Sequence, residues 1–546
     1  MEYIWNCRGC YQAAENDKYS VWLSGLVLLE NKSCDLLKLA ELAFHQRLHY
    51  PSLSGNFKLM AYSREDDSYL FFGDHAGSQY FYIDTEHALF SDSLLDLRVK
   101  QGDAARLNMS AALELVEYGR TLGDKTLVFG IKKTCSNHYY RFHDGKIEVF
   151  DKGLPTFSQM PEQISLDDVC GPFLSALGEE KVCAICTGGT DSRAILSNLI
   201  YRKVSPALLL TGHTTNPDIP IAEKIAQTLD LPLTLVSFQD REAGWLEKGF
   251  FFFDGMQDAV LSYRHLKKAR HVKEKGYAFE FGGVGGEFYK NSFCLPFRQG
   301  HIRNKEKHLR QILSGSGDSR RACFGDALRA ARPETDTFVD TLIRKGLQEK
   351  SLLAACNHVG FEFLKSISGS VTNSYAAVCC KIDPLMDRRL IAAVSHKRPQ
   401  RLAMHIWQRR TISAYAPALS DIPTDQGYSC SVNSWKLLKE RWKKLRFYAS
   451  RVTARLRQKL GLRYQSSIQH YWDNDYAVAR ESDCWKQALK RCEELGVLRK
   501  DVQEKEIPLN KTGIILQIGF LFHNDFQGLY AKNQYILNKQ EGKENL

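Results

Sequence analysis

The sequence predicts an α/β protein whose two halves are built differently. In residues 1–150, short apolar runs alternate with polar turns, which is typical of an antiparallel sheet. From residue 165 onward, short apolar runs are separated by helical patterns, and this succession builds a parallel sheet. Residues beyond about 300 are mostly helical in pattern. A chain of 546 residues is too long for one hydrophobic core, so we expect two or three domains.

The first half is expected to combine strands with helices. Apolar runs bounded by turn residues predict strands at 19–28, 57–62, 69–72, 80–83 and 88–91. Apolar residues at helical spacing predict helices at 36–48 and 111–118. Residues 151–163 contain Gly153, Pro155 and Pro161, and we interpret them as a linker to the second half.

The second half is expected to alternate helices with buried strands. In chain order, we expect a helix at 168–177, a strand at 182–186, a helix at 192–200, a strand at 207–211, a helix at 221–229 and a strand at 233–238. Parallel strands of this kind bind ligands at their carboxyl ends. The loops that follow these strands are therefore the first place to look for a functional site.

The composition indicates an ordinary globular protein. Hydrophobic residues make up 44% of the chain and charged residues 25%. Residues 1–5 lack the start of a secretory signal, and the apolar stretches at 250–253 and 514–522 are too short or interrupted to form a transmembrane segment. The fifteen cysteines lie scattered in mostly apolar segments, which favours reduced thiols and a cytoplasmic location.

Two cysteine pairs have the spacing of a metal chelate. Cys183 and Cys186 lie on a predicted strand and point to opposite sides of it, so they chelate a metal poorly. Cys7 and Cys10 have no downstream pair of comparable spacing. A zinc site there remains an alternative to unremarkable thiols.

The positive charge of the chain is concentrated in one segment. Between Lys436 and Arg463 there are eleven lysines and arginines and a single acid, Glu440, whereas the whole chain has a formal net charge of +11. Apolar residues at spacings of 3 and 4 predict an amphipathic helix over 435–463. Its basic face is either solvated or binds an anionic partner, such as an acidic peptide, RNA or a membrane surface.

The loop at 187–192 carries most of the functional information. It follows the strand at 182–186, precedes a helix, and consists of Thr187, Gly188, Gly189, Thr190, Asp191 and Ser192. Two consecutive glycines permit a tight turn with exposed amides, and the helix N-terminus adds positive potential, so the loop suits phosphate oxygens. The Asp191 carboxylate can hold Mg²⁺ against such a phosphate. A purely structural turn is the alternative.

This loop is similar to the SGGxDS pyrophosphate loop, and together with other motifs it makes the chain resemble the asparagine synthetase family. The matching segments of the first half are Leu53–Phe57, Phe72–Gly77, Ala88–Asp92, Tyr118–Gly119 and Thr126–Ile131. These segments consist of turn glycines and core positions, and they supply no catalytic group. The resemblance covers about residues 50–430.

The resemblance implies a division into three parts. Residues 1–150 would form an N-terminal α+β glutamine-amidotransferase-like domain of the Ntn type. Residues 165–430 would form an adenine-nucleotide α-hydrolase-like ATP-pyrophosphatase domain with a parallel sheet, and residues 431–546 a helical C-terminal extension. The family's glutaminase uses a cysteine directly after the initiator methionine, where this chain has Glu2. We therefore expect a degenerate first domain without glutamine hydrolysis, as in the similar β-lactam synthetases and lasso-peptide cyclases.

The resemblance also assigns site residues in the second half. Leu210, Thr211 and Gly212 occupy the position that borders adenine. Residues 281–289 resemble the element that closes over the phosphates, in which Gly283, Gly285 and Gly286 would bind nucleotide. Asp191 and Glu287 are the expected catalytic and metal-binding residues, although Gly286 stands where the family usually has a second aspartate. A flexible glycine loop is the alternative interpretation of this segment.

Three later segments resemble family motifs and show two departures. The segments are Asp383–Leu390, in which Asp387 would cap a helix, His405–Arg410 and Ile422–Tyr428. Asp425 replaces a lysine expected to stabilise charge at the α-phosphate, and Cys380 replaces a glutamate. Arg388, Arg409 and Lys436 are the basic residues that could substitute for the missing lysine.

The function implied by the resemblance is an amide ligase that uses ATP and Mg²⁺. It would adenylate a carboxylate substrate, release pyrophosphate and couple the acyl group to an amine or to ammonia. The replacements at Glu2, Gly286, Cys380 and Asp425 keep open a synthetase-like scaffold without turnover. The basic segment at 435–463 keeps open a pyrophosphate-loop enzyme that acts on RNA.

Overall fold

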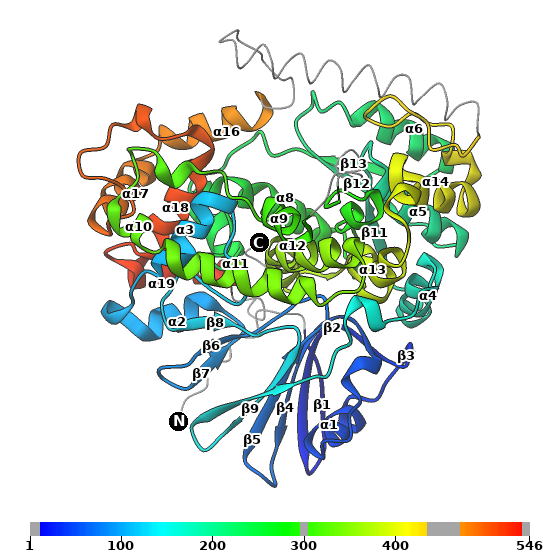
Figure 1. Ribbon diagram of the computed structural model, residues 1–546, viewed down its shortest axis with the longest axis horizontal. Helices are drawn as coiled ribbons and strands as arrows, with labels where there is room; N and C mark the ends of the chain where they lie inside the picture. The colour runs from blue at the N-terminus through cyan, green and yellow to red at the C-terminus, as the bar shows by residue number, and fades with distance from the viewer. Residues whose placement is uncertain (1–10, 295–303, 434–469, 538–546) are drawn as a thin grey trace.

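The computed structural model describes residues 11–294, 304–433 and 470–537. An antiparallel sheet built from the first 150 residues lies in the lower part of Figure 1, and a parallel sheet surrounded by helices lies above it. The α/β fold class expected from the sequence is confirmed at this level. The basic segment at 435–463, Glu2 and the Cys7/Cys10 pair lie outside the described residues.

The large first sheet is antiparallel throughout. Its strands are β1 (Tyr11–Glu15), β2 (Tyr19–Leu29), β3 (Lys32–Ser33), β4 (Leu53–Ser63), β5 (Ser68–Gly73), β9 (His138–His143) and β10 (Lys146–Asp151). They follow the order β1-β2-β4-β5-β9-β10, with β3 beside β2. Helix α1 (Leu36–Phe44) packs against β2 and covers the core around Leu39 and Ala43.

A smaller antiparallel sheet packs against the large one, through Phe81, Ile83 and Phe90. It has the order β7-β6-β8 and consists of β6 (Tyr82–Asp84), β7 (Leu89–Ser91) and β8 (Ile131–Lys133). Strand β6 begins at Tyr82, two residues later than predicted, because the Tyr80 amide donates to the Asn373 side chain at 3.3 Å. Helices α2 (Leu94–Gln101) and α3 (Met109–Tyr118) follow this sheet.

The second sheet has five parallel strands in the order β13-β12-β11-β14-β15. They are β11 (Val182–Ile185), β12 (Ala207–Thr211), β13 (Leu233–Val236), β14 (Phe279–Phe281) and β15 (Cys380–Ile382). The chain first runs outward from β11 to β13 and then returns to the other side of β11 with β14. The strand order therefore reverses between β11 and β14.

Most helices surround the parallel sheet in the upper part of Figure 1, and its strand β15 contacts β2 and β4 of the large antiparallel sheet. The remaining α-helices in the described part of the chain are α4 (Leu166–Leu177), α5 (Thr190–Tyr201), α6 (Ile219–Leu229), α7 (Trp245–Phe252), α8 (Ala259–Glu274), α9 (Lys305–Ile312), α10 (Asp326–Ala330), α11 (Arg332–Leu347), α12 (Leu352–Tyr375), α13 (Arg388–Ser395), α14 (Ile406–Tyr415), α16 (His470–Arg480), α17 (Asp483–Glu494), α18 (Thr512–Leu521) and α19 (Phe526–Leu537).

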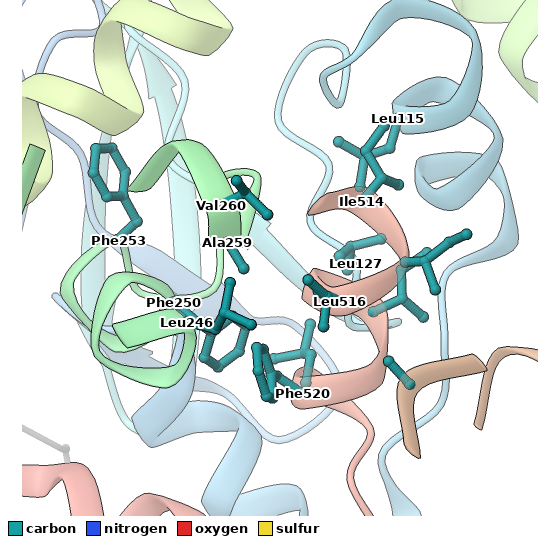
Figure 2. Close-up of a cluster of buried hydrophobic side chains, with 14 of the residues drawn as sticks. Leu115, Leu127, Leu246, Phe250, Phe253, Ala259, Val260, Ile514, Leu516 and Phe520 are labelled. Atoms are coloured by element: carbon teal, nitrogen blue, oxygen red, sulfur yellow. The ribbon is translucent and has the colours of Figure 1, made fainter. Parts of the chain in front are cut away.

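One hydrophobic core contains residues from all three ranges expected from the sequence, 1–150, 165–430 and 431–546. Figure 2 shows Ile514, Leu516 and Phe520 of α18 between Leu115 of α3 and the side chains of α7 and α8. All residues of α18 are buried. The Lys511 ammonium, just before α18, donates to the Val116 carbonyl at 2.6 Å. Helix α18 is thus an internal element of the described fold.

A polar contact also ties the first 150 residues to the second half. The buried Asp254 carboxylate, just after α7, accepts hydrogen bonds from the amides of Leu94 and Leu95 at 2.7 and 3.1 Å. It also accepts from the Ser93 hydroxyl at 2.8 Å. A carboxylate at this place satisfies the free amides of the α2 N-terminus and favours the helix dipole.

The longest helices of the described chain do not meet the requirements of a membrane span. Among residues 11–294, 304–433 and 470–537, none combines the length and the apolar character needed to cross a bilayer.

Candidate active site

The loop at 187–192 and the loop at 282–290 meet at the carboxyl edge of the parallel sheet. The first follows β11 and the second follows β14, and these strands are direct neighbours, with Ala184 paired to Phe281. The strand order reverses at this pair. In open parallel sheets such a reversal leaves a crevice in which ligands bind.

The 187–192 loop is held in shape by its own hydroxyl groups. The Thr187 and Ser192 oxygens lie 2.8 Å apart, and the Gly189 amide donates to the Thr187 hydroxyl at 3.4 Å. Helix α5 begins at Thr190 and has no side-chain cap at its N-terminus. Its first amides therefore keep the positive potential that attracts an anion.

Glycines allow the two loops to approach each other closely. A Cβ atom at Gly283 would lie 2.8 Å from the Ser192 amide nitrogen. A Cβ atom at Gly286 would lie 2.0 Å from the Asp191 carboxyl carbon. Any side chain at 286 would occupy the space of the Asp191 carboxylate. The glycine at 286 therefore leaves the space in which the Asp191 carboxylate lies.

The Asp191 carboxylate binds two groups from distant parts of the chain. The Lys290 ammonium forms an ion pair with it, and the Gln408 side-chain amide donates to it at 3.0 Å. Gln408 also donates to the Gly286 carbonyl at 3.3 Å and so links both loops to helix α14. About a fifth of each side chain in the ion pair is exposed, at 20% for Asp191 and 22% for Lys290. Solvent therefore reaches the pair.

Glu287 lies on the same short turn as Lys290 but has different surroundings. Within the described residues, its carboxylate makes no hydrogen bond or ion pair. It acts electrostatically on Arg120, whose pKa burial lowers to about 10 while Glu287 works in the opposite direction. The Arg120 guanidinium itself stacks over the Phe363 ring at 4.1 Å. The metal-binding role of Glu287 stays a prediction.

Two carboxylates border the other end of the 187–192 loop. The Gly188 amide hydrogen-bonds Asp218, and the Asp425 amide donates to the Gly188 carbonyl at 3.1 Å. Burial first, and then the charge of Asp425, raise the pKa of Asp218, while the Gly188 amide lowers it. A Cβ atom at Gly188 would lie 2.5 Å from an Asp218 oxygen, so a side chain there would displace the Asp218 carboxylate.

Arg193 explains why Asp425 reaches the loop. This arginine is fully buried in the first turn of α5, and it donates to the carbonyls of Ile422 and Pro423 at 2.6 and 3.1 Å. A tight turn follows, in which the Thr424 amide donates to the Tyr428 carbonyl at 2.8 Å. Helix α5 thereby fixes the segment that carries Asp425.

The N-terminus of α14 forms a second wall beside the loop. The His405 Nδ1 atom lies 3.0 Å from both the Thr190 hydroxyl and the Tyr428 hydroxyl. The buried Arg409 guanidinium stacks over the Tyr428 ring at 4.8 Å and donates to the Ser431 carbonyl. This contact network connects the 187–192 loop to the segment at 422–428.

The three residues expected near adenine lie at the end of β12. The Leu210 side chain is 2% exposed and belongs to the hydrophobic core, so it faces inward. Thr211 is half-buried, and the Gly212 amide donates to the Val236 carbonyl at 3.2 Å. Of these three residues, Thr211 and Gly212 are therefore the ones whose polar groups could contact a ligand at this strand end.

The basic residues considered from the sequence have other partners. Arg388 donates to the Pro155 carbonyl at 2.9 Å and stacks over Phe157, next to the linker. Arg409 is buried as described above, and Lys436 lies outside the described residues. The sequence does not indicate Lys290, because it belongs to none of the motifs. A hint is that Gly286 stands at the position of an expected aspartate, which leaves space for another group.

The residues at the loop have the donor types that suit Mg²⁺. A carboxylate and two hydroxyl oxygens are hard ligands of the kind that magnesium binds together with phosphates. Gly286 leaves room for the Asp191 carboxylate, which would supply the protein ligand. Lys290 competes for the same carboxylate, so a metal ion can bind Asp191 only if the Lys290 ammonium is displaced from it.

Comparison with known proteins gives no assignment for this chain. It matches no protein-family model, and no curated protein matches it either.

Proposed function

We propose that this protein is an ATP-dependent ligase that adenylates a carboxylate, releases pyrophosphate and forms an amide. The proposal rests on one observation above all. The 187–192 loop, with its uncapped helix N-terminus, lies where the strand order of a parallel sheet reverses. The resemblance to the asparagine synthetase family, including the expected Ntn-type and α-hydrolase-like domains, agrees with this placement and belongs to the same proposal.

In the proposed reaction, the chain binds and orients the leaving diphosphate. The hydroxyls of Thr187 and Ser192 and the first amides of α5 receive the β- and γ-phosphate oxygens. Asp191 would hold Mg²⁺, which neutralises negative charge on the departing pyrophosphate. The acyl carboxylate attacks the α-phosphate, and an amine or ammonia then attacks the resulting acyl-adenylate and displaces AMP.

Lys290 has a specific role in this proposal. Because Asp425 stands where a lysine was expected, the reaction needs a cation from elsewhere. Lys290 is already held beside the 187–192 loop by Asp191. When Asp191 turns to Mg²⁺, the Lys290 ammonium becomes available to phosphate oxygens, where it stabilises the charge that develops in the transition state.

Carboxylate-dependent exchange of labelled pyrophosphate into ATP tests the first half-reaction. We expect exchange with at least one member of a panel of amino acids, peptides and small organic acids. An Asp191→Asn variant should lose it, whereas Asp230→Asn should keep it. Asp230 is an exposed, left-handed cap of α6 and serves as the matched control. Exchange that survives in Asp191→Asn contradicts the proposal.

A scaffold without turnover is the second candidate function. The observation that favours it is the pair of carboxylates, Asp218 and Asp425, at Gly188, since they repel phosphate and occupy one amide of the loop. Calorimetric ATP binding without exchange for any carboxylate supports the scaffold. Absence of both binding and exchange rules out either nucleotide function.

A further inference from the structure

Three potential metal ligands meet in the core, away from the 187–192 loop. They are Cys294, His308 and Cys356, and one ligand atom from each lies within 4.8 Å of the other two. Both thiols are fully buried, and His308 is 6% exposed. Cys294 follows the turn that carries Lys290, His308 lies on α9 and Cys356 lies near the start of α12.

The backbone just before Cys294 is fixed by close packing. The Phe293 ring contacts Gly360 of α12, where a Cβ atom would lie 2.6 Å from the ring. It also packs on the Phe288 ring, with centroids 5.3 Å apart. Asn291 adopts a left-handed conformation, and its side chain donates to the Pro399 carbonyl. The segment that leads into Cys294 is therefore held in place.

The hydrogen bond of His308 leaves one of its ring nitrogens for a metal. Its Nε2 atom lies 3.2 Å from the Phe293 carbonyl, to which it can donate. Metal-binding histidines usually donate their other N–H to a carbonyl or carboxylate, which fixes the tautomer. The Nδ1 atom of His308 is then the basic nitrogen, free of its proton.

The apolar surroundings favour an electrically neutral complex, and the ligand atoms determine which metal suits the site. The two thiols belong to the same hydrophobic cluster as Leu309, Leu353 and Val359. Two thiolates and a neutral imidazole around a divalent cation form an electrically neutral group, so burial of the complex costs little charge desolvation. Sulfur and nitrogen ligands favour zinc over magnesium or calcium.

We propose that Cys294, His308 and Cys356 bind a zinc ion, with a water molecule as its fourth ligand. Zinc–sulfur and zinc–nitrogen bonds of about 2.3 and 2.1 Å place ligand atoms roughly 3.6–3.8 Å apart, so ligand atoms that now lie within 4.8 Å of one another need to approach by at most about 1 Å. On binding, the two thiols lose their protons to solvent. The ion ties the segment after Lys290 to α9 and α12.

Metal analysis of the purified full chain tests this site. We expect about one zinc per chain after removal of loosely bound metal, and a loss of most of it in Cys356→Ser. Cys170→Ser is the matched control, because Cys170 is an equally buried thiol of the same core cluster. The double variant Cys7→Ser/Cys10→Ser should keep its zinc. Zinc that leaves with Cys7 and Cys10, or a wild-type chain that binds none, overturns the proposal.

Cobalt substitution of the wild-type chain tests the ligands without any variant. Co²⁺ in a tetrahedral site with two thiolates gives visible ligand-field bands and a near-ultraviolet sulfur-to-metal charge-transfer band, and Zn²⁺ should displace both. Absence of these bands contradicts the site. A chain purified without reductant that contains a Cys294–Cys356 disulfide and takes up neither metal after reduction contradicts it as well.

Discussion

The two ends of the 187–192 loop have opposite electrostatic surroundings. At the helix end, the Asp191 carboxylate pairs with Lys290 and accepts from Gln408. At the strand end, Gly188 lies between Asp218 and Asp425, and the repulsion between these carboxylates contributes to the raised pKa of Asp218. The same short loop therefore brings a compensated carboxylate and an acidic pair close together.

This difference indicates how the loop can bind a polyanion. Phosphate groups are attracted by the α5 N-terminus and by Lys290 but are repelled by Asp218 and Asp425. The diphosphate should therefore bind toward Asp191. The following variants test this asymmetry, beginning with the largest expected effect.

Removing the charge of Asp191 should have the largest effect on catalysis. Asp191→Asn keeps the shape that Gln408 contacts but removes the proposed metal ligand. We expect pyrophosphate release to fall by about 10²–10³-fold, which is typical for the loss of one transition-state charge contact. The free energy of unfolding should change by less than about 1 kcal/mol, because the ion pair with Lys290 is partly exposed. Steady-state kinetics and thermal unfolding measure the two quantities.

Adding one methyl group at Gly286 should disturb the Asp191 end of the 187–192 loop, because the methyl group crowds the Asp191 carboxylate. In Gly286→Ala the new Cβ atom would lie 2.0 Å from the Asp191 carboxyl carbon, so the carboxylate must move. We expect a loss of about 1–3 kcal/mol in stability and weaker ATP binding. Gly189→Ala is the steric control, since its Cβ would meet only the Thr187 hydroxyl at 3.5 Å. Equal stability losses in both variants would show that the close approach has no special cost.

Replacing Lys290 separates its two proposed roles. Lys290→Met should lower kcat by about tenfold, because a cation is lost from the transition state. It should also lower the Mg²⁺ concentration that gives half-maximal activity, because the ammonium no longer competes for Asp191. Lys290→Arg should retain much of kcat. A variant in which neither quantity changes contradicts both roles.

Neutralising the acidic end should give the smallest effect, in the opposite direction. Asp425→Asn should strengthen ATP binding by about threefold at low salt, and the gain should shrink as salt screens the charges. Isothermal titration calorimetry at two ionic strengths measures both. Weaker ATP binding in this variant would mean that Asp425 serves the nucleotide directly.

The pair of Asp218 and Asp425 predicts that both the stability of the fold and its ATP affinity depend on pH. Because burial and Asp425 raise the pKa of Asp218, this carboxyl becomes neutral as the pH falls, at a higher pH than an ordinary aspartate. The folded state then binds the proton more tightly than the unfolded state, so this group favours folding more as the pH falls through its raised pKa. ATP affinity should rise over the same interval, and in Asp425→Asn the rise should move to lower pH.

The sequence predicts local features of the site because they depend on local patterns. The apolar run at 182–185 and the two glycines mark the strand, the turn and the start of α5, which begins at Thr190, two residues before the predicted start. Asp387 caps α13 as expected, with its carboxylate accepting from the Arg389 amide at 2.8 Å. In each case the interacting groups lie a few residues apart.

The partners of Asp191 could not be predicted in this way. Lys290 and Gln408 come from segments 99 and 217 residues away, and nothing in their local sequence indicates the contact. Strand β15 has only three residues, too few for a periodic pattern, and its place beside β14 depends on the whole sheet. Similarly, the burial of α18 depends on side chains of α3, α7 and α8.

Helix α18 has a consequence for the order in which this chain can mature. Lys511 and Val116 are bound to each other across 395 residues of sequence. While the polypeptide is being synthesised, the surfaces of α3 and α7 that later receive Leu516 and Phe520 stay open until the ribosome has released α18. A chain truncated before residue 512 would expose these apolar surfaces, and chaperones or proteases would recognise it as unfinished.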